Sequence, residues 1–146
     1  MKLKYSMLAG WRKVEGWQDK LDTTPADILP GSPHRTAVLL HDAKSQAMIF
    51  IVPLRLPSFF DPLKLVKVIS QGHVKQGNLV SPIETDGSDH KFTYITPDGM
   101  SAGKVLIRKL SEEQSVYAVA VGLWPSEPED IPKVAFELIA GSLRLA

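Results

Sequence analysis

The stretch Val116-Tyr117-Ala118-Val119-Ala120-Val121-Gly122-Leu123 decides the fold, because it is apolar on both of its alternating faces. A strand with one face in water alternates apolar and polar side chains. This stretch therefore predicts a central strand that is covered on both faces. The rest of the chain has to supply its neighbours and that cover.

Three strand-like segments precede this one, at about residues 77–84, 89–96 and 102–110. Short connections rich in turn-forming residues separate the four segments, and Asp86-Gly87 and Pro97-Asp98-Gly99 are two of them. Such short connections join antiparallel strands, whereas parallel strands need crossovers of a dozen or more residues. The four segments, the last at about 115–123, therefore predict an antiparallel meander.

A hairpin and a helix are predicted upstream of the meander. Segments 36–41 and 47–54 read as two strands joined by a polar turn. Asp61 is then suited to cap a helix, with Pro62 at its first position and Gly72 at its end.

A second helix is predicted near the C-terminus. Its apolar residues form one stripe at helical spacing: Ile131, Val134, Ala135, Leu138 and Ile139. Asp130 is the predicted N-cap, which places Pro132 in the first turn, where proline is tolerated. A capping box from Ser126 to Glu129 is the rival start, but Pro132 would then lie inside the helix.

These segments together predict an α+β fold with one mainly antiparallel sheet. We expect an α/β/α sandwich, in which helices cover both faces of the sheet. The chain has 146 residues, of which 44% are hydrophobic and 23% charged, so it predicts a single domain spanning 1–146.

Composition excludes several classes of site. The chain has no cysteine, which rules out disulfides, cysteine nucleophiles and zinc or iron–sulfur sites of the cysteine type. Its net charge of +1 argues against a nucleic-acid partner. No apolar run is long enough to span a membrane, and no secretory signal is evident. The sequence as written predicts a cytoplasmic protein, or a periplasmic or envelope protein if a signal segment has been removed.

One stretch matches the G-x-S-x-G pattern of serine hydrolases, Gly99-Met100-Ser101-Ala102-Gly103. A nucleophile elbow needs a helix after the serine, but residues 104–107 read as another strand. The stretch therefore predicts a hairpin turn. A hydrolase that pairs Ser101 with His90 or His41 stays open as an alternative.

No metal or cofactor is predicted. Asp86, Asp89 and His90 gather at one turn without the spacing of a metal site, and turns select Asp and Gly for their own geometry. No phosphate-binding loop or dinucleotide fingerprint is present.

Four aromatic residues are the candidate contacts for a partner: Trp17, Phe59, Phe60 and Trp124. Tryptophan is enriched at binding hot spots, but it also fills cores. Phe59 and Phe60 precede the first predicted helix, so a hydrophobic staple onto that helix is the alternative interpretation.

The layout as a whole resembles the PsbP-like fold group, which includes PsbP, the Ran-binding import factor Mog and DcrB-type bacterial proteins. The resemblance rests on Gly16-Trp17-Gln18-Asp19, on the order of hairpin, helix and meander, on the hairpin at 99–109, and on the ending at 136–145. It implies an α/β/α sandwich without an established active site. Members are accessory proteins, and some are secretion chaperones that shelter apolar segments.

Residues and resemblance together predict a non-enzymatic accessory or binding protein. Its partner is expected to be a protein, and its state a monomer or a dimer. The alternatives are a small-pocket hydrolase and a ligand-binding envelope lipoprotein domain.

Overall fold

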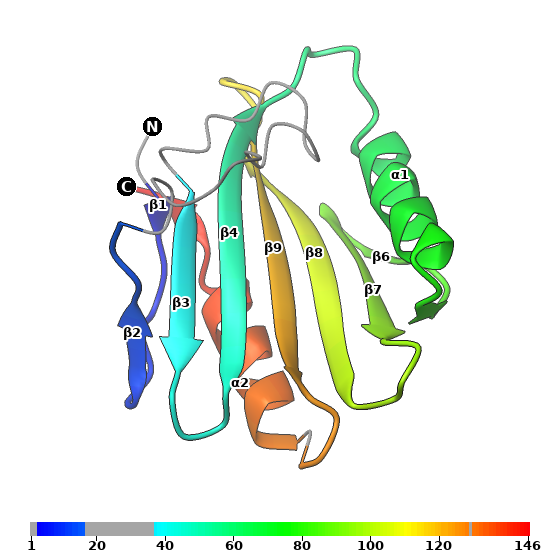
Figure 1. The fold of residues 1–146 in the computed structure, drawn as a ribbon. Coiled ribbons are helices and arrows are strands. Elements are labelled where there is room, and N and C mark those ends of the chain that lie inside the picture. The colour runs from blue at the N-terminus through cyan, green and yellow to red at the C-terminus, as the bar shows by residue number, and fades with distance from the viewer. Residues whose placement is uncertain (1–2, 17–36, 129) are drawn as a thin grey trace.

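An antiparallel sheet of eight strands forms the centre of the structure, a computed structural model that describes residues 3–16, 37–128 and 130–146 (Figure 1). The strand order is β2-β3-β4-β9-β8-β7-β5, and β6 also pairs with β7. The strands are β2 (Trp11–Lys13), β3 (Val38–Asp42), β4 (Ala47–Arg55), β5 (Leu79–Val80), β6 (Glu84–Asp86), β7 (Asp89–Ile95), β8 (Ser101–Ser111) and β9 (Val116–Pro125). A separate ladder joins β1 (Leu3–Lys4) to β10 (Arg144–Leu145).

The predicted central strand is confirmed as β9. It pairs with β4 from Met48 opposite Leu123 to Arg55 opposite Val116, and with β8 on its other side. Its first five residues are buried. Cover on both faces therefore explains the apolar residues 116–120.

The predicted hairpin and meander are also confirmed, with one difference at the edge. The segment expected as one strand at 77–84 is divided into β5 and β6, which both pair with β7. Pro82 lies between them, and proline has no N–H to donate to a ladder. The edge of the sheet beside β7 therefore consists of two short strands.

Two helices accompany the sheet in the described part of the chain. In α1 (Pro62–Lys75), the carboxylate of Asp61 caps the start as predicted and accepts a hydrogen bond from Leu63 N at 2.9 Å. The helix continues past Gly72, and Gly77 with φ of +87° takes the left-handed conformation after its end. In α2 (Asp130–Gly141), Asp130 is the first helical residue and not the cap.

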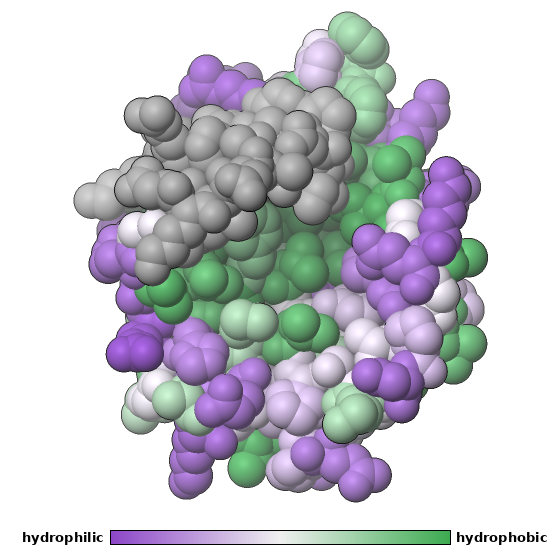
Figure 2. Space-filling model, in the orientation of Figure 1, coloured by the Kyte–Doolittle hydropathy of each residue, from purple (hydrophilic) through white to green (hydrophobic). Residues whose placement is uncertain are grey.

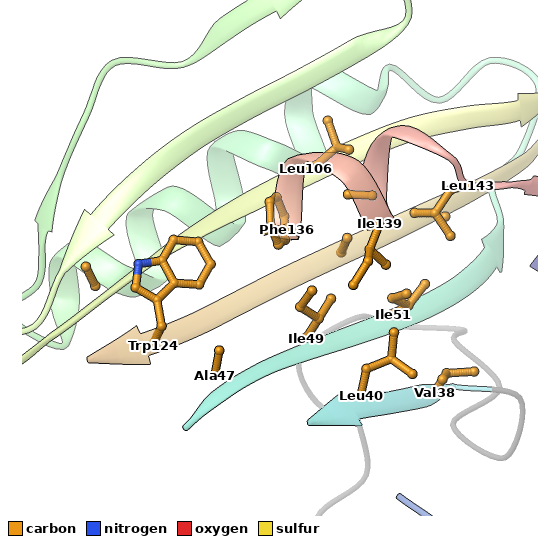
Figure 3. Close-up of a cluster of buried hydrophobic side chains, with 14 residues drawn as sticks. Val38, Leu40, Ala47, Ile49, Ile51, Leu106, Trp124, Phe136, Ile139 and Leu143 are labelled. Carbon is orange, nitrogen blue, oxygen red and sulfur yellow. The ribbon is translucent and has the colours of Figure 1, made fainter. Parts of the chain in front are cut away.

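Buried side chains form two clusters on opposite faces of the sheet. Alternate residues of β4 separate them: Ile49 and Ile51 belong to a cluster with α2, whereas Val52 and Leu54 belong to a cluster with α1. We call these the α2-side cluster, drawn in Figure 3, and the α1-side cluster.

The expected α/β/α sandwich is wrong. The described residues are 44% strand and 21% helix, and they contain only two helices. α1 packs on β5 and β7, and α2 packs on β8 and β9. Strands lie about 4.8 Å apart, so a helix about 10 Å wide covers only two of them and forms no layer over so wide a sheet. The protein is a mostly β structure.

Apolar surface of the sheet continues beside α1, on the side seen in Figure 2. Phe50 of β4 and Val121 and Leu123 of β9 are only partly buried, and they pack against the α1-side cluster. This surface is the part of that face that α1 leaves uncovered.

Tyr94 connects α1 to the middle of the sheet. Its hydroxyl crosses Gly103 and donates a hydrogen bond to the Gly122 carbonyl at 2.7 Å. Burial raises the pKa of Tyr94 to about 12. The ring of His73 from α1 stacks on Tyr94 with 4.3 Å between the ring centroids.

The close approach of Tyr94 to Gly103 leads to a first prediction. A Cβ there would lie 2.4 Å from Tyr94 Cζ and 2.1 Å from the Gly122 carbonyl oxygen. Gly103→Ala should therefore lower the free energy of unfolding by roughly 3 kcal/mol, through overpacking and loss of the tyrosine hydrogen bond. Urea denaturation measures this change.

Gly72→Ala is the matched control. A Cβ at Gly72 meets no atom within 4 Å, and alanine favours the helix, so stability should rise by up to about 1 kcal/mol. Equal stability of the Gly103→Ala variant and the natural chain would contradict the proposed contact.

His73 generates a second prediction, on pH. Burial lowers the pKa of His73. Its Nδ1 accepts a hydrogen bond from Asn78 Nδ2 at 2.8 Å, which a protonated ring could not do. The unfolded chain therefore binds the proton more readily. The free energy of unfolding should be constant above about pH 6.5 and should fall as the pH drops below it.

His73→Phe should remove this pH dependence between about pH 5 and 7, whereas His41→Gln should keep it. Urea titrations at several pH values measure both. Identical pH profiles for His73→Phe and the natural chain would show that this histidine does not couple folding to pH.

Candidate functional site

The three predicted contact residues that the structure describes do not form one site. Trp17 lies outside the described residues. Phe59 is 89% exposed, and its neighbour Phe60 is half-buried against the α1-side cluster, which contains Leu65 of α1. That packing agrees with a hydrophobic staple for Phe60. Contact with a partner stays a prediction for all four.

Trp124 belongs to the α2-side cluster. It is only 2% exposed, and its ring lies against Phe136 with 5.8 Å between the centroids (Figure 3). Its Nε1 is the one buried side-chain nitrogen or oxygen without a hydrogen-bond partner in the described part of the chain. Trp124 therefore fills the space beneath α2.

An open groove of about 560 Å³ lies between α2 and residues 8–11. One wall is formed by Ile131, Val134, Ala135 and Leu138 of α2, and the other includes Leu8 and Trp11. Asp42, Lys44 and Asp130 bring charge to its lining. We call this feature the α2 groove.

The groove wall differs from the predicted core stripe of α2. Ile131, Val134 and Leu138 are more than half exposed, and Phe136 and Ala140 are buried in addition to Ala135 and Ile139. Gly122 provides the physical reason, because a Cβ there would lie 2.6 Å from the Phe136 ring. Because Gly122 has no side chain, the ring of Phe136, the largest side chain of α2, packs against the sheet there. The predicted apolar stripe of α2 therefore faces partly outward.

The opposite wall is built around Asp42. Gly10, with φ of +89°, precedes Trp11, and Trp11 pairs with Asp42 across β2 and β3. The Asp42 carboxylate accepts hydrogen bonds from Ser45 Oγ at 2.6 Å and from Lys44 N at 3.3 Å. The Ser45 hydroxyl is the main cause that lowers the pKa of Asp42. A charged carboxylate is therefore held rigidly in the lining of the groove.

Charged residues of β8 fasten α2 to the sheet. Arg108 donates from Nε and Nη2 to the Asp89 carboxylate at 2.9 and 2.8 Å. Its Nη1 donates to the carbonyls of Ala140 and Gly141 at 3.0 and 2.7 Å, at the C-terminal end of the helix. Lys104 forms an ion pair with Glu137 farther along α2. The α2 wall of the groove is therefore held in place.

The serine of the G-x-S-x-G stretch lies far from both candidate histidines. Ser101 begins β8, whereas His90 pairs with Ile107, six residues along the same ladder. That offset corresponds to about 20 Å. His41 lies on β3, three strands away from β8. The predicted hairpin turn at this stretch is confirmed, and no serine–histidine pair forms there.

The described residues contain no group of three or more histidine or acidic side chains placed to hold a metal ion. None of the helices in the described ranges is long and apolar enough to cross a membrane.

Sequence reasoning missed the groove because it assigned the whole apolar stripe of α2 to the core. One signal was available. Seven of the twelve residues of α2 are hydrophobic, in the segment DIPKVAFELIAG. That set extends around the helix beyond the stripe that one face of a sheet can bury. The excess indicated that part of the helix would stay uncovered.

The Arg108 contacts predict the stability of the groove wall. Arg108→Lys keeps the charge but loses the forked geometry, so the Asp89 carboxylate and two helix carbonyls lose hydrogen bonds. The free energy of unfolding should fall by about 1–3 kcal/mol. Lys104→Gln, at a more exposed ion pair, should cost less than about 1 kcal/mol. Equal losses in urea denaturation would contradict the anchoring role of Arg108.

No protein-family model matches the sequence, and no curated protein matches it. The resemblance to the PsbP-like fold group therefore stays a prediction. The α2 groove and the other exposed surfaces are the features of the molecule that bear on its function.

Proposed function

We propose that this chain is a non-enzymatic binding protein that holds an apolar segment of a protein partner in the α2 groove. The observation that carries the proposal is the exposure of Ile131, Val134 and Leu138 along one groove wall. Apolar residues at this i, i+3, i+7 spacing are the pattern that partner segments engage on a helix. A partner would remove their apolar surface from water.

The groove has two further properties that suit this role. Its other wall is also largely apolar, with Leu8 and Trp11, so an inserted side chain would be contacted from both sides. Arg108 and the Lys104–Glu137 pair fix α2 before any partner arrives. A preformed site loses less conformational entropy on binding than one that must be ordered.

The resemblance to the PsbP-like fold group supports the same role, because its members are accessory proteins. That support concerns function alone, since the mostly β architecture differs from the sandwich that the resemblance implies.

A small apolar molecule is the second candidate occupant. The groove volume of about 560 Å³ falls within the range of about 300–1,000 Å³ that is typical of ligand sites. We therefore expect the same residues to serve either occupant, and the experiment has to separate the two.

Val134→Asp tests the proposal, with Val68→Asp of α1 as its matched control. Both valines lie on exposed helix surfaces, at 57% and 60% exposure, so both variants should fold. Affinity purification from the source cells, read by mass spectrometry, identifies partners. A partner identified in this way should bind Val134→Asp at least about tenfold more weakly than it binds the natural chain. It should bind Val68→Asp about as tightly as the natural chain.

If a partner bound the natural chain and both variants equally, its interface would lie outside the α2 groove, which would contradict the proposal. If no protein copurifies, a library of apolar small molecules decides between the occupants. Thermal stabilisation of the natural chain but not of Val134→Asp would favour the ligand-binding candidate over the protein-binding one.

A further inference from the structure

Positive charge is concentrated on the segment that carries α1. Residues 55–83 contain four basic residues, Arg55, Lys64, Lys67 and Lys75, and one acidic residue, Asp61. The segment therefore carries a formal charge of +3, although the whole chain carries only +1. The Asp61 carboxylate is used as the helix cap, where it accepts a hydrogen bond from Leu63 N. The remainder of the chain has a net negative charge.

The lysines occupy the outer face of α1. Lys64, Lys67 and Lys75 are exposed, and the helical period places them on one side. Leu65 and Val66 are buried on the other side, against the sheet. The helix itself contains no acidic residue, so nothing on it neutralises the lysines.

Exposed apolar side chains lie among these lysines. Val68 and Val74 of α1 are more than half exposed, and Phe59, three residues before the helix, is almost fully exposed. Phe60 turns inward to the α1-side cluster, which leaves Phe59 as the aromatic side chain that projects at the start of the helix. The outer α1 face, defined here as Phe59, Lys64, Lys67, Val68, Val74 and Lys75, therefore combines cations with apolar groups.

We propose that the outer α1 face docks on the surface of an anionic lipid bilayer. Anionic headgroups attract clustered lysines, and an exposed aromatic ring enters the boundary between headgroups and acyl chains. The broad apolar side of α1 is already packed on the sheet, so the helix does not embed. Attachment is therefore mainly electrostatic, and Phe59 adds the apolar contribution.

The residue types favour a bilayer over a nucleic acid. Single-stranded nucleic acids are held by several aromatic platforms beside arginine, which stack on successive bases. The outer α1 face has one exposed aromatic side chain, and its cations are lysines, which act as compact point charges.

This surface is independent of the α2 groove. α1 and α2 pack against opposite faces of the sheet, in separate clusters of buried residues. A bilayer on the outer α1 face would leave the groove open to its own occupant. Either site could therefore fail its test without affecting the other.

Vesicle cosedimentation with the full chain tests the proposal. Vesicles of phosphatidylcholine alone are compared with vesicles that also contain phosphatidylserine, in low and in high salt. We expect binding only to the phosphatidylserine vesicles, and weaker binding in high salt because salt screens the lysines. Each lysine contributes about fivefold, so Lys64→Gln/Lys67→Gln/Lys75→Gln should lower the partition coefficient by about a hundredfold.

Two controls separate this surface from general charge and hydrophobicity. Lys4→Gln/Arg12→Gln/Lys13→Gln makes the same change of net charge at exposed basic residues elsewhere and should bind nearly as the natural chain does. Phe59→Ser should weaken binding several-fold, whereas Met100→Ser, at another exposed apolar residue, should not. Circular dichroism confirms that each variant is folded.

Three results would overturn the proposal. The first is no sedimentation with phosphatidylserine vesicles, and the second is equal binding to neutral vesicles. The third is an equal loss of binding in the two triple variants, since the outer α1 face would then have no special role. If the chain bound single-stranded RNA but no vesicles, this would be a case of the first result. The outer α1 face would then bind a nucleic acid and not a bilayer.

Discussion

The pairing of β9 with β4 is the interaction on which the rest of the structure depends. It joins residues that are 61 to 75 positions apart, from Arg55 opposite Val116 to Met48 opposite Leu123. Without it, the hairpin β3–β4 and the meander that ends in β9 would be two narrow sheets, each with an open edge. The entropy lost in closing so long a loop is offset by burial of β9 on both faces.

Two glycines on neighbouring strands, Gly122 of β9 and Gly103 of β8, decide where the helices lie on this sheet. Gly122 leaves room for Phe136, which draws α2 against β8 and β9. Gly103 leaves room for the ring of Tyr94, on which His73 of α1 stacks. A missing side chain on each face thus sets the position of a helix, and with it the position of an exposed surface.

The two exposed surfaces differ in chemistry because the helices bury different amounts of their own apolar residues. α2 is apolar over more of its circumference than the sheet can cover, and its remainder lines a groove. α1 buries its apolar side and presents lysines to solvent. One sheet therefore supports an apolar site on one face and a cationic site on the other.

The sequence by itself determined the strands of the hairpin and of the meander, apart from the division of its edge strand into β5 and β6. It also determined the turns and the helix starts near Asp61 and Asp130, because periodicity, turn residues and caps act over a few neighbours. It also determined that β9 is central, since an apolar run needs cover on both sides. Only the tertiary structure decided that β9 pairs with β4, that α1 and α2 each cover only part of a face, and that Val134 and Leu138 point into a groove. Those outcomes depend on contacts between residues far apart in the chain, such as Gly122 with Phe136, and no local pattern encodes such contacts.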